Sequence, residues 1–253
     1  MAGNAYEKEY QIHYYEIDYR RKALITSIVD YLGDAATSQA EELGIGMDYL
    51  MENRFGWVLY KWNIDMYSYP HYNEKIIIRT WAHSFRKFYA YRRYEFINSK
   101  GEIIGKADSI WFLINMDRRR PVRINEHLCS TFGVVEEDCP IDIENITAPS
   151  KVDSEKLFDV RYSDIDTNGH VNNTKYIAWA IETVPKDIVL NYTLNNLKVT
   201  YEKETTYGEA ARIFTEVIVE GDKYICHHKI IDNEDKELTL LKTTWVKNDI
   251  FKK

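Results

Sequence analysis

Two stretches of the sequence, YEIDYRRKA (15–23) and SDIDTNGHV (163–171), align with each other without a gap. A second pair, HYNE (71–74) and TYGE (206–209), follows in the same order. Similar segments that recur in the same order are typical of a repeated structural unit. The sequence therefore predicts that one unit occurs twice along the chain.

The first copy reads as a long helix followed by strands. Residues 26–43 carry an apolar face, with Ser27 as a candidate N-cap and Gly44 as a stop signal. Four strand-like runs come next, and NSKG forms a hairpin turn between the last two. These runs are residues 57–69, 75–85, 88–97 and 102–115.

The second half repeats this order, with a short strand, a helix that opens at Asn172 or Asn173 and is stopped by Pro185, and four further strands. The five strands are expected at residues 156–162 and near 193–204, 210–219, 223–231 and 237–247. An apolar helix needs a sheet to cover it, and two sheets side by side can join. We therefore predict an α+β fold of two domains, each a long helix wrapped by an antiparallel sheet, with one continuous sheet.

The predicted domains are residues 1–126 and residues 156–253, joined by a linker at residues 127–155. The linker is rich in Asp, Glu, Pro and Ser and has weak periodicity. A connection of this length is long for a loop inside one compact domain, which favours a crossover between two domains.

Composition limits the class of protein. The chain has 253 residues and is 45% hydrophobic, which is typical of a globular protein. It has no run of about 18 apolar residues, and MAGNAYEKEYQ at the start lacks the apolar core of a signal peptide. We expect a cytoplasmic protein without membrane insertion. The three Cys have no C-x-x-C spacing and are expected to be reduced, with no thiolate metal site.

The charge is unevenly distributed. The net charge of -7 argues against nucleic acid as the main partner. Residues 1–126 carry 18 Lys and Arg against 17 Asp and Glu, whereas residues 127–253 carry 15 against 23. The longest basic cluster of the first half consists of Arg118, Arg119, Arg120 and Arg123. Such a cluster is either a solvated surface or a docking surface for an acidic protein or a phosphate-bearing ligand.

The polar stretch YSDIDTNGHVNN (162–173) is the main candidate for a functional site. Its DIDTNG resembles the start of a calcium loop, but the twelfth position is Lys175 instead of a bidentate Glu, and a strand comes before it. Asp and Asn are also ordinary residues of turns and N-caps. If this stretch were only a turn, the matching stretch of the first copy should have similar residues. The first copy does not have them.

The two copies differ at the positions that carry chemistry. Opposite Asp166, the first copy has Asp18, so the carboxylate is shared. Opposite Asn168 and His170, it has Arg20 and Lys22. The amide and the imidazole occur only in the second copy, which favours a catalytic function there.

These residues carry a family resemblance. SDIDTNGHVNNTKYIAW, followed later by LKVTYEKE, resembles the acyl-acyl carrier protein (acyl-ACP) thioesterases of plants and bacteria. The resemblance spans essentially the whole chain. It implies a tandem hotdog fold and hydrolysis of fatty acyl-ACP to free fatty acid and holo-ACP, which ends fatty acid synthesis. By position, the catalytic residues of the family fall on Asp166, Asn168, His170 and Glu204. Where plant members have a Cys after that Glu, this chain has Thr205, so it would work through its carboxylate.

A mechanism follows from these residue types. Thioester hydrolysis needs a positioned water, a base and donors for the developing oxyanion. Glu204, expected on a strand that faces the helix start, is the candidate base, with nucleophilic attack by its carboxylate as the alternative. His170 would hold the water or protonate the departing thiolate. Asn168 would fix the orientation of His170, and Asp166 would favour the useful tautomer of its imidazole. Backbone N–H groups at the helix start, at Asn172 and Asn173, would form the oxyanion site.

The aromatic residues are also unevenly distributed, with 23 of the 35 Trp, Tyr and Phe in residues 1–126. This bias, like the resemblance, suggests that the first half holds the acyl chain and the second half cleaves it. The cluster Arg118, Arg119, Arg120 and Arg123 would then dock the acidic carrier protein, which carries the substrate on a phosphopantetheine arm.

Three alternatives remain open from the sequence. They are a hotdog acyl-CoA thioesterase, a 2-enoyl thioester hydratase, and a non-catalytic acyl-thioester binding protein. His227 and His228 are adjacent on a strand and so point to opposite faces. No carboxylate or His partner at ligand spacing is expected for His13, His71, His83 and His127. No metal or cofactor is expected, and the chain can be a monomer or a homodimer.

Overall fold

The computed structural model describes residues 3–134 and 139–247. The chain divides into two compact units. The first contains the residues up to Trp62 and Tyr67–Ile143, and the second contains Asn63–Met66 and the residues from Glu144 onward. The division falls inside the predicted connection, and the last four residues of one strand of the first copy belong to the second unit.

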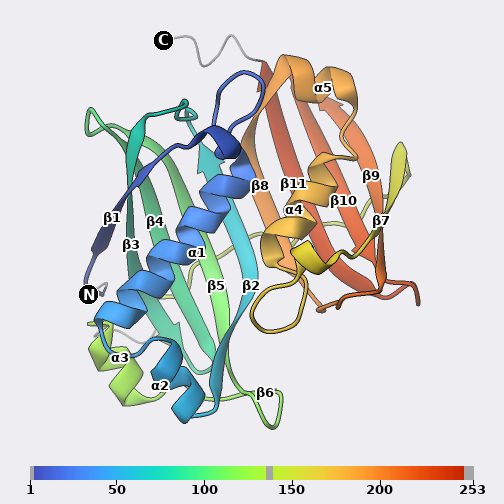
Figure 1. Ribbon diagram of the computed structural model, residues 1–253. Coiled ribbons are helices and arrows are strands. Elements are labelled where there is room, and N and C mark those ends of the chain that lie inside the picture. Colours follow the sequence, from blue (N-terminus) through green and yellow to red (C-terminus); the bar gives the residue numbers. More distant parts are fainter. Residues whose placement is uncertain (1–2, 135–138, 248–253) are drawn as a thin grey trace. The chain divides into compact units, whose positions relative to one another are not determined.

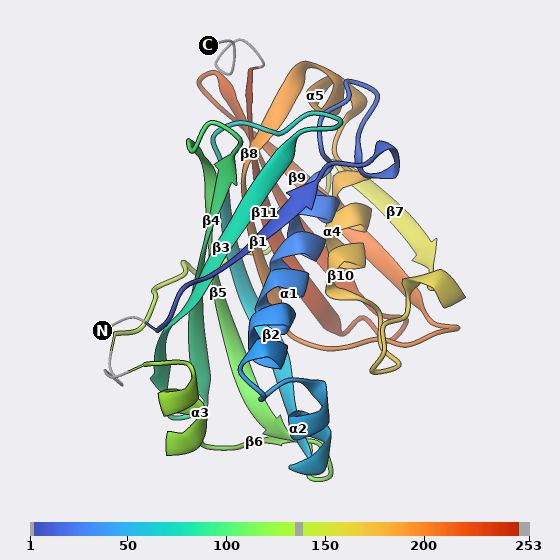
Figure 2. The ribbon, with the colours of Figure 1, turned by 60° about the vertical axis from the view of Figure 1, so that its left-hand side comes forward.

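The first unit is an antiparallel sheet with one long helix against it (Figures 1 and 2). Its strand order is β1-β3-β4-β5-β2, and α1 packs against β1 and β3. The strands are β1 (Tyr6–Gln11), β2 (Phe55–Met66), β3 (Lys75–Arg86), β4 (Tyr89–Asn98), β5 (Ile103–Asn115) and β6 (Arg120–Pro121), which pairs with β5. The helices are η1 (Tyr14–Glu16), α1 (Ile25–Glu42), α2 (Met47–Glu52) and α3 (Glu126–Thr131).

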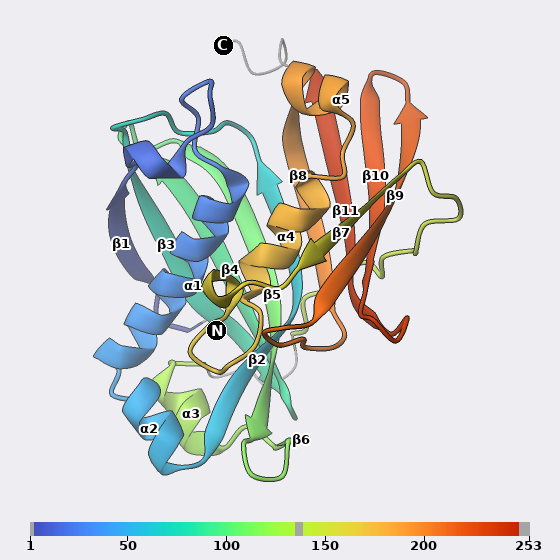
Figure 3. The same ribbon diagram turned by 45° about the vertical axis from the view of Figure 1, so that its right-hand side comes forward.

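The second unit repeats this arrangement (Figure 3). Its strand order is β7-β9-β10-β11-β8, and α4 packs against β9, β10 and β11. The strands are β7 (Ser154–Asp159), β8 (Tyr192–Tyr201), β9 (Ala210–Glu220), β10 (Lys223–Ile231) and β11 (Glu237–Lys247). The helices are η2 (Tyr162–Asp164), α4 (Asn173–Ile181) and α5 (Lys186–Asn191). Two copies of one α+β unit are therefore confirmed.

The apolar faces of α1 and α4 explain their positions. Ile28, Leu32 and Ala35 of α1 are fully buried, and so are Ile177 and Ala180 of α4. These residues recur at the three- and four-residue spacing of one helix face, so each helix buries a continuous stripe against its own sheet. Because each buried methylene group contributes about 0.8 kcal/mol, these stripes hold each helix to its sheet.

Several predicted boundaries are wrong, and three of them concern the helices or the candidate site. The first helix begins at Ile25 with Leu24 as its N-cap, so Ser27 lies inside the helix, where its hydroxyl donates to the carbonyl of Glu16. The strand expected to reach residue 204 ends at Tyr201. The second helix ends at Ile181 instead of at Pro185, which is the N-cap of the separate helix α5. The predicted N-cap Asn172 is confirmed, because its side chain accepts the N–H of Thr174 at 2.9 Å.

Candidate active site

The polar stretch forms a short loop between β7 and α4 (Figure 3). An ion pair between the exposed Arg161 and the buried Asp164 holds its first residues. Asp164 is completely buried and accepts hydrogen bonds from the guanidinium of Arg161 at 3.1 Å. Burial alone would raise the pKa of this carboxyl, but the hydrogen bonds from Arg161 outweigh burial and lower it. Asp164 therefore remains ionised and fixes the entry to the loop.

Asp166 closes the loop from within. Its Oδ1 accepts the backbone N–H groups of Asn168 at 2.8 Å and of His170 at 3.3 Å. Its other oxygen lies 3.4 Å from the side-chain amide of Asn168. Gly169 occupies the left-handed region at a φ of 81° with open space around it, which allows the chain to reverse. The contacts described for Asp166 are with the loop backbone and Asn168, so it positions the loop that carries the imidazole.

The loop brings His170 to Glu204. The Nε2 of His170 lies 3.3 Å from the Oε2 of Glu204, within the distance of an ion pair. The imidazole is mostly buried and the carboxylate is about half exposed, with exposed side-chain fractions of 21% and 45%. A carboxylate and an imidazole at this distance can exchange a proton directly or share one water.

Glu204 lies past the end of β8, in the connection to β9. The residue that follows ties this connection to the loop, because the N–H of Val171 donates to the carbonyl of Thr205 at 2.9 Å. The N–H of Thr205 in turn donates to the phenol oxygen of Tyr176 at 3.3 Å. The position of Glu204 is therefore fixed by hydrogen bonds from the loop and from α4 rather than by strand pairing.

Tyr176 is a residue of the candidate site that the sequence did not predict. It is 2% exposed on the buried face of α4, where an aromatic residue looks like ordinary core. Burial raises the pKa of its phenol, and the charges of Glu204 and Asp166 raise it further. Tyr176 is therefore a neutral phenol beside the candidate base.

The start of α4 offers fewer free donors than the sequence suggested. The N–H of Asn172 donates to the carbonyl of Asp164 at 2.8 Å, and the N–H of Lys175 donates to the carbonyl of Asn172 at 2.9 Å. With Thr174 bonded to the Asn172 side chain, the N–H of Asn173 is the donor of this turn without a described acceptor in the part of the chain that the structure covers. Asn173 is thus the better candidate for an oxyanion donor, and Asn172 is a cap.

The first copy has the same loop with different chemistry. Asp18 accepts the backbone N–H groups of Arg20 at 2.8 Å and of Lys22 at 3.0 Å, as Asp166 does in the second copy. The N–H of Ala23 donates to the carbonyl of Pro70, which matches the bond from Val171 to Thr205. Tyr69 therefore takes the position of Glu204, and burial raises the pKa of its phenol. With Lys22 and Tyr69 at the two key positions, the first copy has no counterpart of the pair His170–Glu204. Its own His13 lies 3.0 Å from Glu16, at the positions where the second copy has the ion pair Arg161–Asp164.

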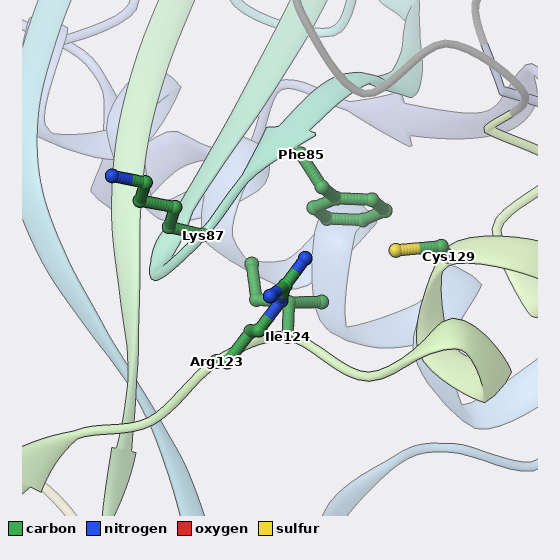
Figure 4. Close-up of a pocket in the computed structure, with 5 residues that line it drawn as sticks. All are labelled: Phe85, Lys87, Arg123, Ile124 and Cys129. Carbon is green, nitrogen blue, oxygen red and sulfur yellow. The ribbon is translucent and has the colours of Figure 1, made fainter.

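The predicted docking cluster is exposed. Arg118, Arg119, Arg120 and Arg123 all lie on the surface, in and after the turn that follows β5. Arg123 also lines a cavity of about 20 Å³ with Phe85, Lys87, Ile124 and Cys129 (Figure 4). A cavity of that size holds about one water, so it is no substrate pocket.

The remaining buried histidine is part of the core. His228 is completely buried on β10, with its two ring nitrogens within hydrogen-bond distance of Thr215 at 2.8 Å and Thr243 at 3.0 Å. Burial lowers its pKa to about 3, so the ring is neutral. Within residues 3–134 and 139–247, no three His, Cys, Asp or Glu side chains gather in a way that could hold a metal, and no helix is long and apolar enough to cross a membrane.

Both halves of the chain match one protein family. Residues 3–132 match the acyl-ACP thioesterase N-terminal domain, and residues 147–247 match the acyl-ACP thioesterase C-terminal domain. The chain therefore belongs to the acyl-ACP thioesterase family, and the predicted resemblance is confirmed.

Two plant proteins illustrate the similarity. The chain is 27% identical over 222 residues to oleoyl-acyl carrier protein thioesterase 2, chloroplastic, of Arabidopsis thaliana. The aligned region covers 80% of this chain and 60% of that protein. The chain is 24% identical over 261 residues to dodecanoyl-[acyl-carrier-protein] hydrolase, chloroplastic, of Cinnamomum camphora, which covers 96% of the chain and 68% of that protein. The chain thus spans about 60% of the length of the first of these relatives.

Two solved structures share the fold. An oleoyl thioesterase (putative) from Lactobacillus plantarum superposes with a TM-score of 0.92 at 25% identity and covers 97% of each chain. The 12:0-ACP thioesterase from Umbellularia californica superposes with a TM-score of 0.84 at 23% identity and covers 96% of this chain and 94% of that one. The predicted tandem hotdog fold is confirmed.

Proposed function

We propose that this protein is a fatty acyl-ACP thioesterase that hydrolyses acyl-ACP to free fatty acid and holo-ACP. The observation that carries the proposal is the distance of 3.3 Å between His170 and Glu204, on a loop and a connection that hydrogen bonds hold together. Membership of the family supports the substrate class. The carboxylate–imidazole pair and a nearby N–H donor are the groups that thioester hydrolysis requires.

The proposed reaction proceeds through attack by water. Glu204 takes a proton from a water that lies beside the pair and hydrogen-bonds to both side chains, and the hydroxide attacks the thioester carbonyl carbon. The carbonyl oxygen becomes anionic and accepts the N–H of Asn173, where the helix dipole also favours negative charge. The proton passes from Glu204 to His170, the C–S bond breaks, and His170 transfers the proton to the departing thiolate, which leaves both side chains as they began.

The other residues of the site act by position. Asn168 is held against Asp166 and belongs to the loop that presents the imidazole. Tyr176 holds the backbone at Thr205 and thereby the adjacent Glu204. Thr205 cannot replace the carboxylate, because an unactivated hydroxyl is a weak nucleophile and its side chain is buried.

The division of labour between the copies belongs to the same proposal. Catalysis is assigned to residues 156–253, which contain the carboxylate–imidazole pair, and acyl-chain binding to residues 1–126. The aromatic bias of the first half supports this assignment, with 23 of the 35 aromatic residues there. The exposed Arg118, Arg119, Arg120 and Arg123 are the proposed dock for the acidic carrier protein. A cytoplasmic location stays a prediction.

The test measures thiol release from saturated acyl groups of graded length, linked either to carrier protein or to coenzyme A. We expect release from acyl-ACP by the unmodified protein, and a loss of about 10² to 10⁴ in kcat for Glu204→Gln. A 2-enoyl hydratase would liberate no thiol, and a binding protein would bind acyl-ACP without turnover. A higher kcat/KM with coenzyme A thioesters than with acyl-ACP would identify acyl-CoA as the substrate instead.

Reversing the charge of the arginine cluster tests the dock separately. Glu at positions 118, 119 and 120 should raise KM for acyl-ACP and leave turnover of a short coenzyme A thioester intact, because the cluster contacts the carrier rather than the reacting atoms. An unchanged KM for acyl-ACP would remove this cluster from the proposal.

A further inference from the structure

The loop of the first copy that corresponds to the catalytic loop borders a surface groove. The groove has a volume of about 480 Å³, which is within the range of about 300 to 1,000 Å³ for small-ligand sites. Seven residues line it, from the loop after β1 and from the turn before β3: Tyr14, Tyr15, Ile17, Asp18, Tyr19, Arg21 and Tyr72.

Four of these residues are tyrosines with unusually exposed rings. The exposed fractions are 80% for Tyr14, 77% for Tyr15, 69% for Tyr19 and 41% for Tyr72. Folding does not need aromatic rings in water, and a gathering of exposed aromatic side chains around a hollow is typical of an interaction site.

The second copy shows which of these side chains the scaffold itself needs. Tyr162 and Tyr207 stand at the positions of Tyr14 and Tyr72, so those two rings occur in both copies. Opposite Tyr15, Tyr19 and Arg21, the second copy has Ser163, Thr167 and Gly169. Two aromatic rings and one guanidinium are therefore specific to the first copy.

Arg21 occupies a strained position in this groove. Its φ is 65°, in the left-handed region where the second copy has Gly169. A non-glycine residue there costs about 1 kcal/mol. Its guanidinium lies 5.7 Å from the centre of the Tyr72 ring, and that of Arg20 lies 5.3 Å from the Tyr19 ring. A guanidinium stacked on a ring keeps its N–H groups directed outward and suits recognition of a phosphate.

We propose that this groove binds an aromatic base that carries phosphate, as in a free nucleotide or in the nucleotide end of coenzyme A. The exposed rings would stack on the base, and Arg21 would pair with the phosphate. A stable protein partner would bury about 800 Å² on each side, whereas the residues that form this groove are seven in number. The proposed binding site thus lies in the copy that has Lys22 and Tyr69 in place of His170 and Glu204, and this inference does not depend on the proposed hydrolysis.

Isothermal titration calorimetry with the protein of residues 1–253 tests the proposal. The probes are coenzyme A, 3′,5′-ADP and ADP, with phosphopantetheine as a probe that has phosphate but no base. We expect the three base-containing probes to bind and phosphopantetheine to bind at least tenfold more weakly, because stacking contributes about 1 to 3 kcal/mol per base. Tighter binding of coenzyme A than of ADP would identify a coenzyme A site, and equal affinity a nucleotide site.

Two variants locate the binding. Arg21→Gly installs the residue of the second copy and removes the backbone strain, so the protein should fold, and affinity should fall about tenfold through loss of one charge-assisted contact. Tyr15→Ala should weaken binding by a similar factor. Lys87→Gly is the matched control, because Lys87 is another exposed cation at positive φ, in the turn between β3 and β4.

Several outcomes would overturn the proposal. They are no binding of any base-containing probe, affinity unchanged in Arg21→Gly and Tyr15→Ala, or loss of carrier-protein binding in those variants without any nucleotide binding. His170→Ala separates this inference from the proposed function, because it should lose thioester turnover and keep nucleotide affinity.

Discussion

The loops at residues 13–24 and 161–172 have the same backbone and different chemistry. In both, one Asp accepts two backbone N–H groups, and the last residues hydrogen-bond to the connection that follows a strand of the same unit. The side chains differ at two matching positions, one late in the loop and one on the connection. These are Lys22 and Tyr69 in the first copy and His170 and Glu204 in the second. The comparison shows that each loop rests on two carboxylates that accept backbone N–H groups, Glu16 and Asp18 in the first copy and Asp164 and Asp166 in the second, and that other positions of the loop differ in chemistry.

The buried faces of the two sheets also share hydroxyl positions and differ in a titratable residue. Thr80 faces Tyr94 across β3 and β4, and Thr215 faces His228 across β9 and β10. In each copy a Trp then donates to a hydroxyl two residues earlier, Trp111 to Ser109 and Trp245 to Thr243. The hydroxyl positions are shared, whereas the titratable residue between them has changed.

The largest expected effect separates the two loops by activity. His170→Ala and Glu204→Gln should each reduce kcat for acyl-ACP by about 10² to 10⁴, because they remove the groups that move protons. The corresponding changes Lys22→Ala and Tyr69→Phe should leave kcat within about twofold. Steady-state kinetics with circular dichroism as a check on folding measures this. A loss in Lys22→Ala as large as in His170→Ala would mean that both loops take part in the reaction.

The next effect separates the two cores by pH. The pKa of His228 is about 3 in the folded chain and near 6.5 when unfolded, so below pH 6.5 the unfolded chain binds a proton that the folded chain does not. The free energy of unfolding should therefore decrease as pH falls from about 6.5 toward 3, by about 1.4 kcal/mol per pH unit at most. Urea unfolding at stepped pH measures the slope.

Two variants assign this slope to His228. His228→Gln should flatten it, and His227→Gln, which changes the partly exposed neighbour, should not. NMR titration of the His228 ring in the unmodified protein gives an independent reading. A folded-state pKa near 6.5 would contradict the prediction. In the first copy the matching residue is Tyr94, which has no transition in this range because burial raises its pKa to about 12.

The smallest effect tests whether the carboxylates of the two loops are structurally equivalent. Asp18→Ala and Asp166→Ala should each lower the free energy of unfolding by about 1 to 3 kcal/mol, because each leaves two backbone donors without their acceptor. Only Asp166→Ala should also reduce turnover. Asp→Asn at either position keeps an acceptor oxygen and should recover most of the stability. Unequal losses, measured by chemical unfolding, would show that the loops rest on different contacts.

Much of the fold was accessible from the sequence, because long elements have enough residues to display a period. The helix predicted at 26–43 is α1, and the strand predicted at 237–247 is β11. The helices α2, α3 and α5 were not predicted, since each has six residues, too few for a periodic pattern. Helix starts also depend on tertiary contacts, as with Ser27, whose hydroxyl bonds to Glu16 instead of capping.

For the candidate site, the sequence identified the pair and missed its support. His170 and Glu204 lie together as the mechanism required. The strand was expected to carry Glu204, but it ends three residues earlier, at Tyr201, because backbone bonds from residues 202 and 203 to Leu238 replace regular pairing. Tyr176 looks like a core residue on a helix face, and only coordinates reveal which backbone donor its oxygen meets. The roles of Asp166, Asn168 and Asn173 stay predictions.

The bond from Thr205 to Tyr176 has a consequence for redesign. In the first copy, Pro70 stands at the position of Thr205 and has no backbone N–H, and Ile28 stands at the position of Tyr176 and has no oxygen in its side chain. Donor and acceptor have thus been exchanged as a unit. An engineer who transplants the thioester-cleaving machinery into the first copy would have to convert Ile28 and Pro70 along with Lys22 and Tyr69, because a grafted threonine amide facing isoleucine would be buried without an acceptor.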